Sequence, residues 1–296
     1  MSVAYAAAVE PRGRMVEIEG GRHLRLVCVG PPAGARPTVL MEAGAFGFSA
    51  DWAAVQERLA AQGLRSCAYD RAGLGHSDPG PKPRDSLAIV SDLEELLAAA
   101  DETGPFILCG HSMAGLHLRV FASRNAQRVR GVVLVDATTP EAMGAATARQ
   151  GVAQLVLFTR LAAWVVSTGL ARPLEVSLGD SIGLPPDAKA EKRWAFANGP
   201  HNRWSAAETA LWTIDAQEGV QSGPYNPDWP VAVILTGEES ASGPRQVVQS
   251  VPARASKHGV VLYVPGANHA SLLGETHADR VVEAILDVEA AAAKAD

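Results

Sequence analysis

The sequence predicts an α/β fold with a largely parallel sheet covered by helices. Short runs of valine, leucine and isoleucine alternate along the chain with alanine-rich segments of helical spacing. One apolar run leads through a serine-bearing turn straight into a further helical segment. At 296 residues the chain is long enough to bury a large core, as one α/β domain plus an insertion.

The expected strands and helices follow from apolar periodicity. Strands are predicted for the continuous apolar runs at residues 38–41, 66–68, 106–109, 132–135, 231–235 and 260–264. Helices are predicted at residues 52–62, 86–100, 116–122 and near the C-terminus. In the second helix Leu87, Val90, Leu93 and Leu97 recur at helical spacing. Strands alternating with helices are typical of a parallel sheet.

A short motif lies between the predicted strand at residues 106–109 and the helix that follows it. Its sequence is Gly110-His111-Ser112-Met113-Ala114-Gly115. A serine on a sharp strand-to-helix turn projects its hydroxyl above the sheet, which is the nucleophile elbow of serine hydrolases. Strand and helix backbones nearly touch there, so the flanking residues must be small, as Gly110, Ala114 and Gly115 are. Ser112 is the predicted nucleophile, and His111 is expected to point away from it.

The loop Tyr69-Asp70-Arg71-Ala72-Gly73-Leu74-Gly75-His76-Ser77-Asp78 follows the predicted strand at residues 66–68. With it the sequence resembles the α/β-hydrolase superfamily, whose members often carry a D-R-x-G-x-G-x-S loop at this point. The resemblance runs from about Val16 to Val288 and is weakest between Thr138 and Asp228. It implies a mostly parallel central sheet flanked by helices, with an inserted helical cap. Asp70 and Arg71 are interpreted as structural residues that tie neighbouring loops together.

A histidine stands in the loop after the last predicted strand, where this fold holds its general base. That residue is His269, preceded by Pro265-Gly266-Ala267-Asn268 and followed by a helix with Val281, Val282, Ile285 and Leu286 on one face. Imidazole titrates near neutrality, so it can accept the serine proton and return it to a leaving group.

Two positions fit the acid that should orient His269. Asp136 ends the predicted strand at residues 132–135, a place that haloalkane-dehalogenase-like relatives use. Glu238 and Glu239 follow the strand at residues 231–235, where most superfamily members have an aspartate and this chain has Ser240 nearby. Asp136 is placed ahead, and Glu238 and Glu239 remain alternatives.

The remaining catalytic groups are backbone amides. A tetrahedral oxyanion needs two preorganised N–H donors. We expect one from Met113, directly after the nucleophile, and the other from Ala45 in the loop after the strand at residues 38–41, with Phe46 as the alternative. No cofactor and no metal is expected for this chemistry.

Residues 138–228 are predicted to form the helical cap, and residues 1–137 and 229–296 the core. Trp164 and Trp212 in the cap, with His76 in the Asp-Arg loop, are expected to line the substrate pocket. Residues 152–170 are apolar but interrupted by polar residues, among them Arg160, so they are interpreted as a cap helix rather than a membrane span.

Net charge, the cysteines and the first residues of the chain bear on the partner, on metal or disulfide sites and on the location of the protein. A net charge of −6 and the lack of a basic stripe argue against a nucleic-acid partner. Cys28, Cys67 and Cys109 lie in apolar runs and are interpreted as small buried residues rather than a disulfide or metal site. The first eleven residues do not resemble a secretory signal, so a cytoplasmic location is expected.

The expected function is hydrolysis of carboxylic esters with small apolar or aromatic groups. Peptides with a free N-terminus, as in proline iminopeptidase-like enzymes, lactones and C–C bonds are alternative substrates. The peptidase alternative requires acidic cap residues to converge on an ammonium group; the candidates are Glu175, Asp180, Asp187, Glu191 and Glu208. A non-catalytic small-molecule-binding protein on the same scaffold is the alternative of another class.

Overall fold

The computed structural model describes residues 12–144, 146–167, 181–241 and 243–294. In these residues one eight-stranded sheet has the strand order β1-β2-β4-β3-β5-β6-β7-β8. The strands are β1 (Arg14–Ile18), β2 (Arg22–Val29), β3 (Thr38–Glu42), β4 (Ser66–Tyr69), β5 (Phe106–His111), β6 (Val129–Val135), β7 (Val231–Thr236) and β8 (Gly259–Val264). Pairing is antiparallel from β1 to β4 and parallel from there to β8. The predicted fold class is confirmed.

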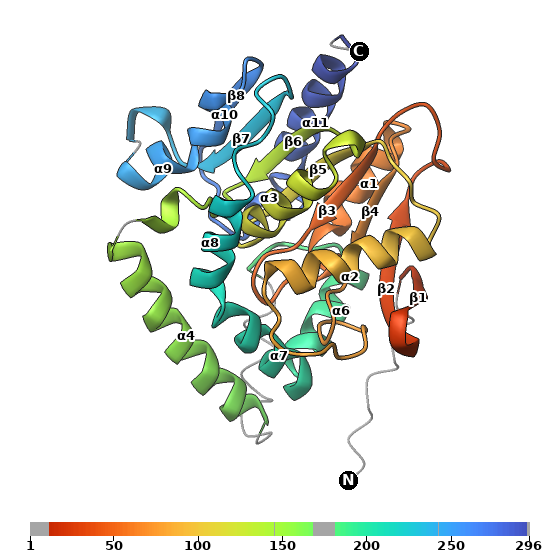
Figure 1. Ribbon diagram of the computed structural model, residues 1–296, viewed down its shortest axis with the longest axis vertical. Coiled ribbons are helices and arrows are strands. Elements are labelled where there is room, and N and C mark those ends of the chain that lie inside the picture. The colour runs from red at the N-terminus through yellow and green to blue at the C-terminus, as the bar shows by residue number, and fades with distance from the viewer. Residues whose placement is uncertain (1–11, 145, 168–180, 242, 295–296) are drawn as a thin grey trace.

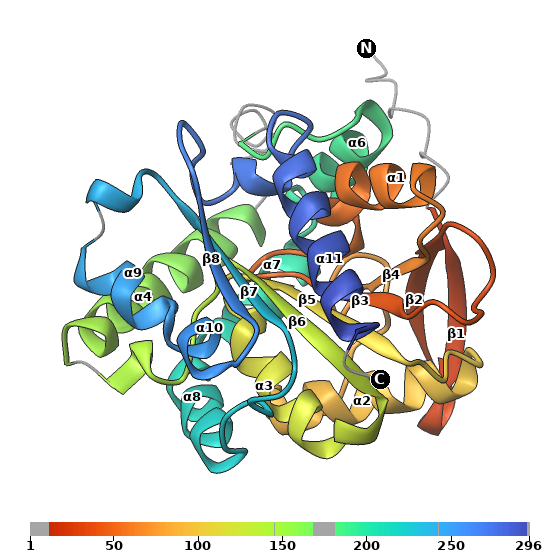
Figure 2. The same cartoon turned by 90° about the horizontal axis from the view of Figure 1, so that it is seen from above.

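Helices cover both faces of this sheet (Figure 2). One face carries α1 (Ala53–Ala61) and α11 (Ala278–Ala292), and the other carries α2 (Ser86–Ala99) and α3 (Ala114–Arg124). The α2 helix is capped at its N-terminus, because the Asp85 side chain accepts a hydrogen bond of 3.0 Å from the Ala88 amide. The remaining helices are α4 (Ala146–Ser167), α6 (Pro186–Phe196), α7 (Gly199–Thr209), α8 (Trp212–Gln221), α9 (Pro244–Gln249) and α10 (Val251–Ala255).

The apolar runs are continuous because the central strands are buried on both faces. Along β3, Val39 and Met41 pack in the cluster that contains α1 and α11, whereas Leu40 packs in the cluster that contains α2 and α3. On β5, Cys109 and Leu108 divide between the two clusters in the same way. Successive side chains of a strand point to opposite faces, so both faces require apolar residues. Each such side chain contributes roughly 1.5–3 kcal/mol on burial.

All the regular secondary structure that is described between β6 and β7 is helical. This part of the chain contains α4, α6, α7 and α8, and no strand lies within its described residues. Figure 1 shows α4 running along the outside of this helical group. The apolar stretch around Val152 belongs to α4. Among the described residues, no helix combines the length and hydropathy that crossing a membrane requires.

The cysteine interpretation is wrong for two of the three residues. Cys28 on β2 and Cys67 on β4 form a disulfide. The cause is strand register: β2 and β4 are antiparallel neighbours, and Cys28 lies directly opposite Cys67 with a Cα–Cα distance of 4.1 Å. This pairing was not visible in the sequence, because 39 positions separate the two residues. Cys109 is a free buried thiol, as expected, and burial raises its pKa.

The helix α8 buries a carboxyl group whose protonation should affect stability. Burial raises the pKa of Asp215 to about 7, although its carboxylate accepts a hydrogen bond of 2.7 Å from the Ser86 amide. The unfolded chain releases this proton at about pH 4. Between about pH 4 and pH 7 the folded protein therefore keeps a proton on Asp215 that the unfolded chain has lost. The free energy of unfolding falls as the pH rises through that range.

Asp215→Asn should remove this pH dependence, because asparagine stays neutral and can still accept from Ser86. The quantity to compare is the unfolding free energy of the variant minus that of the native protein. We expect this difference to increase by about 2 kcal/mol from about pH 5 to pH 8. Urea unfolding at both pH values measures the difference. Asp187→Asn, which changes an exposed carboxylate, is the matched control. An Asp215→Asn advantage that stays constant with pH would contradict a proton held by Asp215.

Candidate active site

The turn at Ser112 has the backbone that an exposed nucleophile needs. Ser112 lies between β5 and α3 with φ 57°, in the left-handed region that side-chain-bearing residues rarely occupy. Three hydrogen bonds hold it there: its amide donates to the Val135 carbonyl at 3.2 Å, and its carbonyl accepts from the amides of Thr138 at 2.8 Å and Gly115 at 3.2 Å. A Cβ on Gly110 would lie 2.6 Å from Leu118, and one on Gly115 would lie 2.3 Å from the Thr138 carbonyl oxygen. Position 115 therefore requires glycine, because backbone blocks a Cβ there, whereas a Cβ at position 110 would require the Leu118 side chain to move.

Three side chains form a continuous hydrogen-bonded series at the carboxyl ends of β5, β6 and β8. The Ser112 Oγ lies 3.0 Å from His269 Nε2. On the other side of the ring, His269 Nδ1 lies 2.5 Å from Asp136 Oδ2. Ser112 is buried and so is Asp136, whereas 45% of the His269 side chain is exposed. The structure thus brings together the serine, histidine and aspartate that the sequence singled out.

Asp136 is held as a carboxylate by partners that sequence analysis did not find. Its Oδ1 accepts from Gln249 Nε2 at 3.0 Å, and Arg245 Nη2 lies 3.6 Å from its Oδ2. Burial raises the pKa of Asp136, but the hydrogen bond and charge of His269, with Arg245 and Gln249, outweigh burial and lower it below its usual value. Asp136 is therefore ionised at neutral pH.

Glu238 and Glu239 do not take this place. Both follow β7 and are exposed. The hydrogen bonds of His269 within the described residues go to Asp136 and Ser112 through its ring and to His111 through its carbonyl, and not to either glutamate.

His111 contacts the histidine of this series. Its ring centroid lies 4.5 Å from that of His269, and its Nε2 lies 2.9 Å from the His269 carbonyl oxygen. Burial lowers the pKa of His111 to about 3, so the ring is neutral at neutral pH. Because a carbonyl can only accept, the proton of neutral His111 must be on Nε2. His111 thereby fixes the loop that carries His269, a contact the sequence pattern did not suggest.

The loop after β3 passes directly over Ser112. A Cβ on Gly44 would lie 2.8 Å from the Ser112 Cβ, so only glycine allows the approach. The loop turns at Ala45 and Phe46, where the Gly47 amide donates to the Gly44 carbonyl at 3.1 Å and Phe46 has φ 58°. Among the loop and turn hydrogen bonds of the described residues, none uses the amide of Ala45, Phe46 or Met113 as donor. Lys192 on α6 donates to the Phe46 carbonyl at 2.9 Å.

Arg71 binds the first residues of the loop that follows β3. Its guanidinium donates to the carbonyls of Ala43 at 2.6 Å and Gly44 at 2.9 Å. It also pairs with Glu42 at 2.7 Å and with Glu208 of α7 at 3.0 Å. All of these ion-pair side chains are buried. Arg71 therefore links the loop beside Ser112 to the helices between β6 and β7.

The Asp-Arg loop packs against those helices, and its glycines leave room for Trp204 at Gly73 and for the Asp70 carboxylate at Gly75. A Cβ on Gly73 would lie 2.4 Å from the Trp204 ring, and the Gly75 amide donates to His201 Nδ1 at 3.0 Å. His76 stacks on Trp194 with ring centroids 4.2 Å apart.

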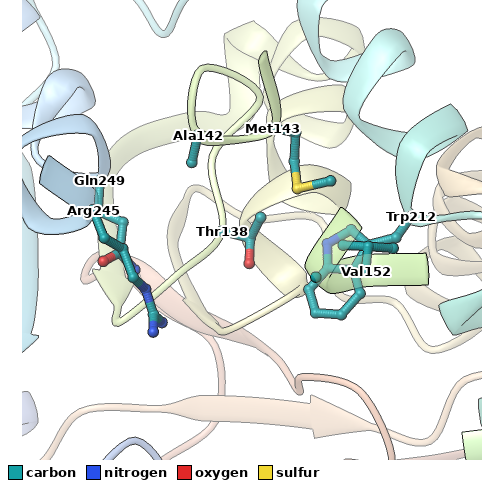
Figure 3. A pocket seen from close by; sticks show the side chains of 8 residues that line it. Thr138, Ala142, Met143, Val152, Trp212, Arg245 and Gln249 are labelled. Atoms are coloured by element: carbon teal, nitrogen blue, oxygen red, sulfur yellow. The ribbon is translucent and has the colours of Figure 1, made fainter. Parts of the chain in front are cut away.

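Figure 3 shows a cavity of about 310 Å³. It lies beside the hydrogen-bonded series, because Gln249 and Arg245, which contact Asp136, line it. Its described lining comprises Thr138, Ala142, Met143, Gly151, Val152, Trp212, Arg245 and Gln249. Trp212, predicted to line a pocket, does line this one. His76 and Trp164 are not among these residues, and the Trp164 side chain on α4 is 66% exposed.

Comparison with protein families gives one match across most of the chain. The family model for the alpha/beta hydrolase fold matches residues 37–274, which include all three members of the hydrogen-bonded series. Among curated proteins, an uncharacterized protein of Schizosaccharomyces pombe is 38% identical over 109 residues. That alignment covers 36% of this chain and 19% of the relative, so the chain matches only a minor part of the relative's length.

Two solved structures share the fold over nearly the whole chain. A thermophilic esterase from Thermogutta terrifontis superposes with a TM-score of 0.66 at 20% identity, covering 93% of this chain and 97% of the esterase. An enol-lactonase from Burkholderia xenovorans LB400 superposes with a TM-score of 0.64 at 20% identity, covering 93% of this chain and 99% of the lactonase. At this identity the likeness establishes the fold alone.

Proposed function

The chain belongs to the alpha/beta hydrolase fold family, and we propose that it is a serine hydrolase that cleaves carboxylic esters through an acyl-enzyme. The observation that carries the proposal is the series from Ser112 Oγ through the His269 ring to Asp136, with bond distances of 3.0 and 2.5 Å. Such a series joins a nucleophile, a general base and the group that orients the base.

In the proposed first half-reaction, Ser112 Oγ forms a bond to the ester carbonyl carbon while its proton moves to His269 Nε2. The carbonyl oxygen becomes an oxyanion. Collapse of this intermediate breaks the bond to the alcohol oxygen, which takes the proton from His269 and leaves as the free alcohol. In the second half-reaction, water attacks the acyl carbon while His269 takes a proton from the water. The bond between the acyl carbon and Ser112 Oγ then breaks, Oγ takes the proton from His269, and the carboxylic acid leaves.

The oxyanion is proposed to bind the amides of Met113 and Ala45. Two features support this choice. Gly44 brings the loop against the Ser112 Cβ, and the amides of Met113 and Ala45 are not used by other loop and turn hydrogen bonds in the described chain. Preorganised amides of this kind stabilise the charge that develops in the transition state without the cost of reorienting solvent.

Asp136 is proposed to act through His269. Accepting from Nδ1 fixes the tautomer that leaves Nε2 free to accept the serine proton, and the carboxylate stabilises the imidazolium that follows. Residues 138–228 are proposed to form a cap, because their described helices pack over the loops that surround Ser112.

The peptidase alternative is disfavoured by the partners of the acidic residues. Glu191 pairs with Arg25 at 2.6 Å and with Arg12 at 3.1 Å, and Glu208 pairs with Arg71. Carboxylates neutralised by arginine are poor ligands for an ammonium group. Of the other candidates, Asp187 is exposed, and Glu175 and Asp180 lie outside the described residues. Lactones are cyclic esters and need the same chemistry, so they fall within the proposed substrate class.

Pre-steady-state hydrolysis of p-nitrophenyl acetate and butyrate tests the proposal. We expect a burst of p-nitrophenol equal to the enzyme concentration, because acylation of Ser112 releases the phenol before deacylation. A lactone and an aminoacyl p-nitroanilide complete the panel. Turnover of the anilide alone would replace the esterase proposal with the peptidase one, and the absence of turnover and burst with every substrate would contradict both.

Arg71→Lys tests the support beneath the oxyanion loop. Lysine keeps the positive charge between Glu42 and Glu208 but cannot donate to both the Ala43 and Gly44 carbonyls in the same geometry. We expect kcat to fall by about tenfold or more with a smaller change in KM, since misplacing an oxyanion donor affects mainly the transition state.

The matched control for this variant is Arg65→Lys. Arg65 forms an ion pair with Glu102 at 2.5 Å and lies directly before β4, at the opposite end of that strand from Arg71. The Arg65→Lys substitution should alter the stability of the protein without lowering kcat. If a folded Arg71→Lys protein keeps the native kcat, the loop does not depend on the guanidinium.

A further inference from the structure

The cavity beside the active site combines apolar walls with one cationic group. We propose that it binds substrates that carry a carboxylate at the far end of a short apolar chain, with Arg245 as the residue that selects them. This inference rests on the proposed ester hydrolysis and narrows its substrate class to anionic esters and lactones.

The apolar wall of the cavity is continuous with the reacting end of the proposed site. Met143, Val152 and Trp212 line the cavity. The same three side chains pack in one cluster with Met113 and Ala45, the residues whose amides are proposed to hold the oxyanion. An apolar chain attached to a carbonyl at Ser112 can therefore extend along this wall without crossing a polar barrier.

The cavity's described lining contains a single charged residue, Arg245 on α9. Figure 3 shows it across the cavity from Met143 and Trp212, with Thr138 between the two sides. The Arg245 side chain is 70% exposed, so a ligand entering from solvent can reach it. A guanidinium offers two parallel N–H donors, which match the two oxygens of a carboxylate.

Arg245 lies beside Asp136 but makes no hydrogen bond to it. Its nearest nitrogen lies 3.6 Å from Asp136 Oδ2, beyond a normal hydrogen bond. The two oxygens of Asp136 accept from His269 and Gln249 instead. Within the described residues, no hydrogen bond to a protein acceptor uses the Arg245 guanidinium, which leaves its donors for a substrate anion.

The position next to Asp136 also limits where the substrate charge can lie. Asp136 is anionic and repels a carboxylate, whereas Arg245 attracts one, so the substrate anion should lie on the cavity side of the guanidinium. The protein's net charge of −6 opposes anion binding at long range. Selection must then come from direct contact with Arg245 and should weaken as salt screens the exposed pair.

Two matched substrate pairs measure this selection. The first compares mono-4-nitrophenyl glutarate with 4-nitrophenyl pentanoate, which differ by a carboxylate at the end of the acyl chain. The second compares 4-acetoxybenzoate with 4-acetoxybenzamide, which places the charge on the alcohol side. For each pair the quantity is the ratio of kcat/KM for the anionic substrate to that for the neutral one. Comparing this ratio between variants cancels differences in intrinsic reactivity.

We expect Arg245→Gln to lower the ratio by about tenfold for at least one pair, and Arg245→Glu to lower it further. Arg245→Lys keeps the positive charge but not the paired donors, so it should lower the ratio less than Arg245→Gln does. Raising NaCl to about 0.5 M should lower the ratio of the native protein but not that of Arg245→Gln. Arg254→Gln, which removes an exposed cation on the neighbouring α10, is the control and should leave both ratios unchanged.

Loss of kcat/KM in Arg245→Gln by the same factor for anionic and neutral substrates would overturn the inference, because Arg245 would then act only on Asp136. Ratios that do not respond to any Arg245 substitution would overturn it too. Both outcomes leave ester hydrolysis itself intact. Failure of the native protein to hydrolyse all four substrates would instead contradict the proposed function from which the inference starts.

Discussion

His269→Ala is expected to lower kcat for ester hydrolysis by about 10⁵-fold or more, because among the described residues only His269 offers the Ser112 hydroxyl a base, at 3.0 Å. The members of a triad act as a unit, so the double variant Ser112→Ala/His269→Ala should be no slower than the slower single variant. Steady-state hydrolysis of p-nitrophenyl acetate by the three variants measures both effects.

His76→Ala is the comparison for this prediction. His76 stacks on Trp194 and makes no hydrogen bond to Ser112 in the described structure. Its removal should change kcat little. If His76→Ala reduced activity severely and His269→Ala did not, the general base would be misassigned. An additive loss in the double variant would show that the two residues do not share one step.

Asp136→Asn is expected to lower kcat by roughly 10⁴-fold. Asparagine can present its N–H₂ to His269 Nδ1 and so favour the tautomer with the proton on Nε2, which cannot accept from Ser112. The negative charge that stabilises the imidazolium is also lost. Gln249, which donates to Asp136 Oδ1, can still hold the asparagine carbonyl, so the fold should tolerate the change. Circular dichroism checks the fold beside the kinetic measurement.

Glu238→Gln and Glu239→Gln are the controls for the acid. Both side chains are exposed and neither contacts His269 in the described structure. Each should change kcat only slightly. If either variant lost most of its activity while Asp136→Asn stayed nearly normal, the residue that orients His269 would instead be a glutamate in the loop after β7.

Much of the fold and of the candidate site could be predicted because short-range geometry dictates the residues. Ser112 needs a left-handed backbone between small neighbours. A Cβ at Gly115 would meet the Thr138 carbonyl, and one at Gly110 would press on the Leu118 side chain, so six consecutive residues carry most of the requirement. Asp136 and His269 each end or follow an apolar strand. Carboxyl ends of parallel strands meet at one edge of the sheet, so their proximity follows from strand order.

The contacts that were missed join segments far apart in the chain. Gln249 and Arg245 reach Asp136 across more than a hundred positions, and nothing in the sequence of α9 indicates where that helix lies. The Cys28–Cys67 disulfide depends on the register between β2 and β4, which a local reading of two apolar runs does not reveal. The sequence indicates that Arg71 ties neighbouring loops together, but only the tertiary structure shows its partners.

The most direct test of the proposed mechanism is the mass of the protein after reaction with a fluorophosphonate. Such probes phosphonylate a serine only where a neighbouring base activates it and an oxyanion site holds the attacked oxygen. The proposal predicts one adduct per chain, located by peptide mass spectrometry on the peptide that contains Ser112 and absent from Ser112→Ala. An adduct on another residue, or one that persists in folded Ser112→Ala protein, would contradict the assignment of Ser112 as the nucleophile.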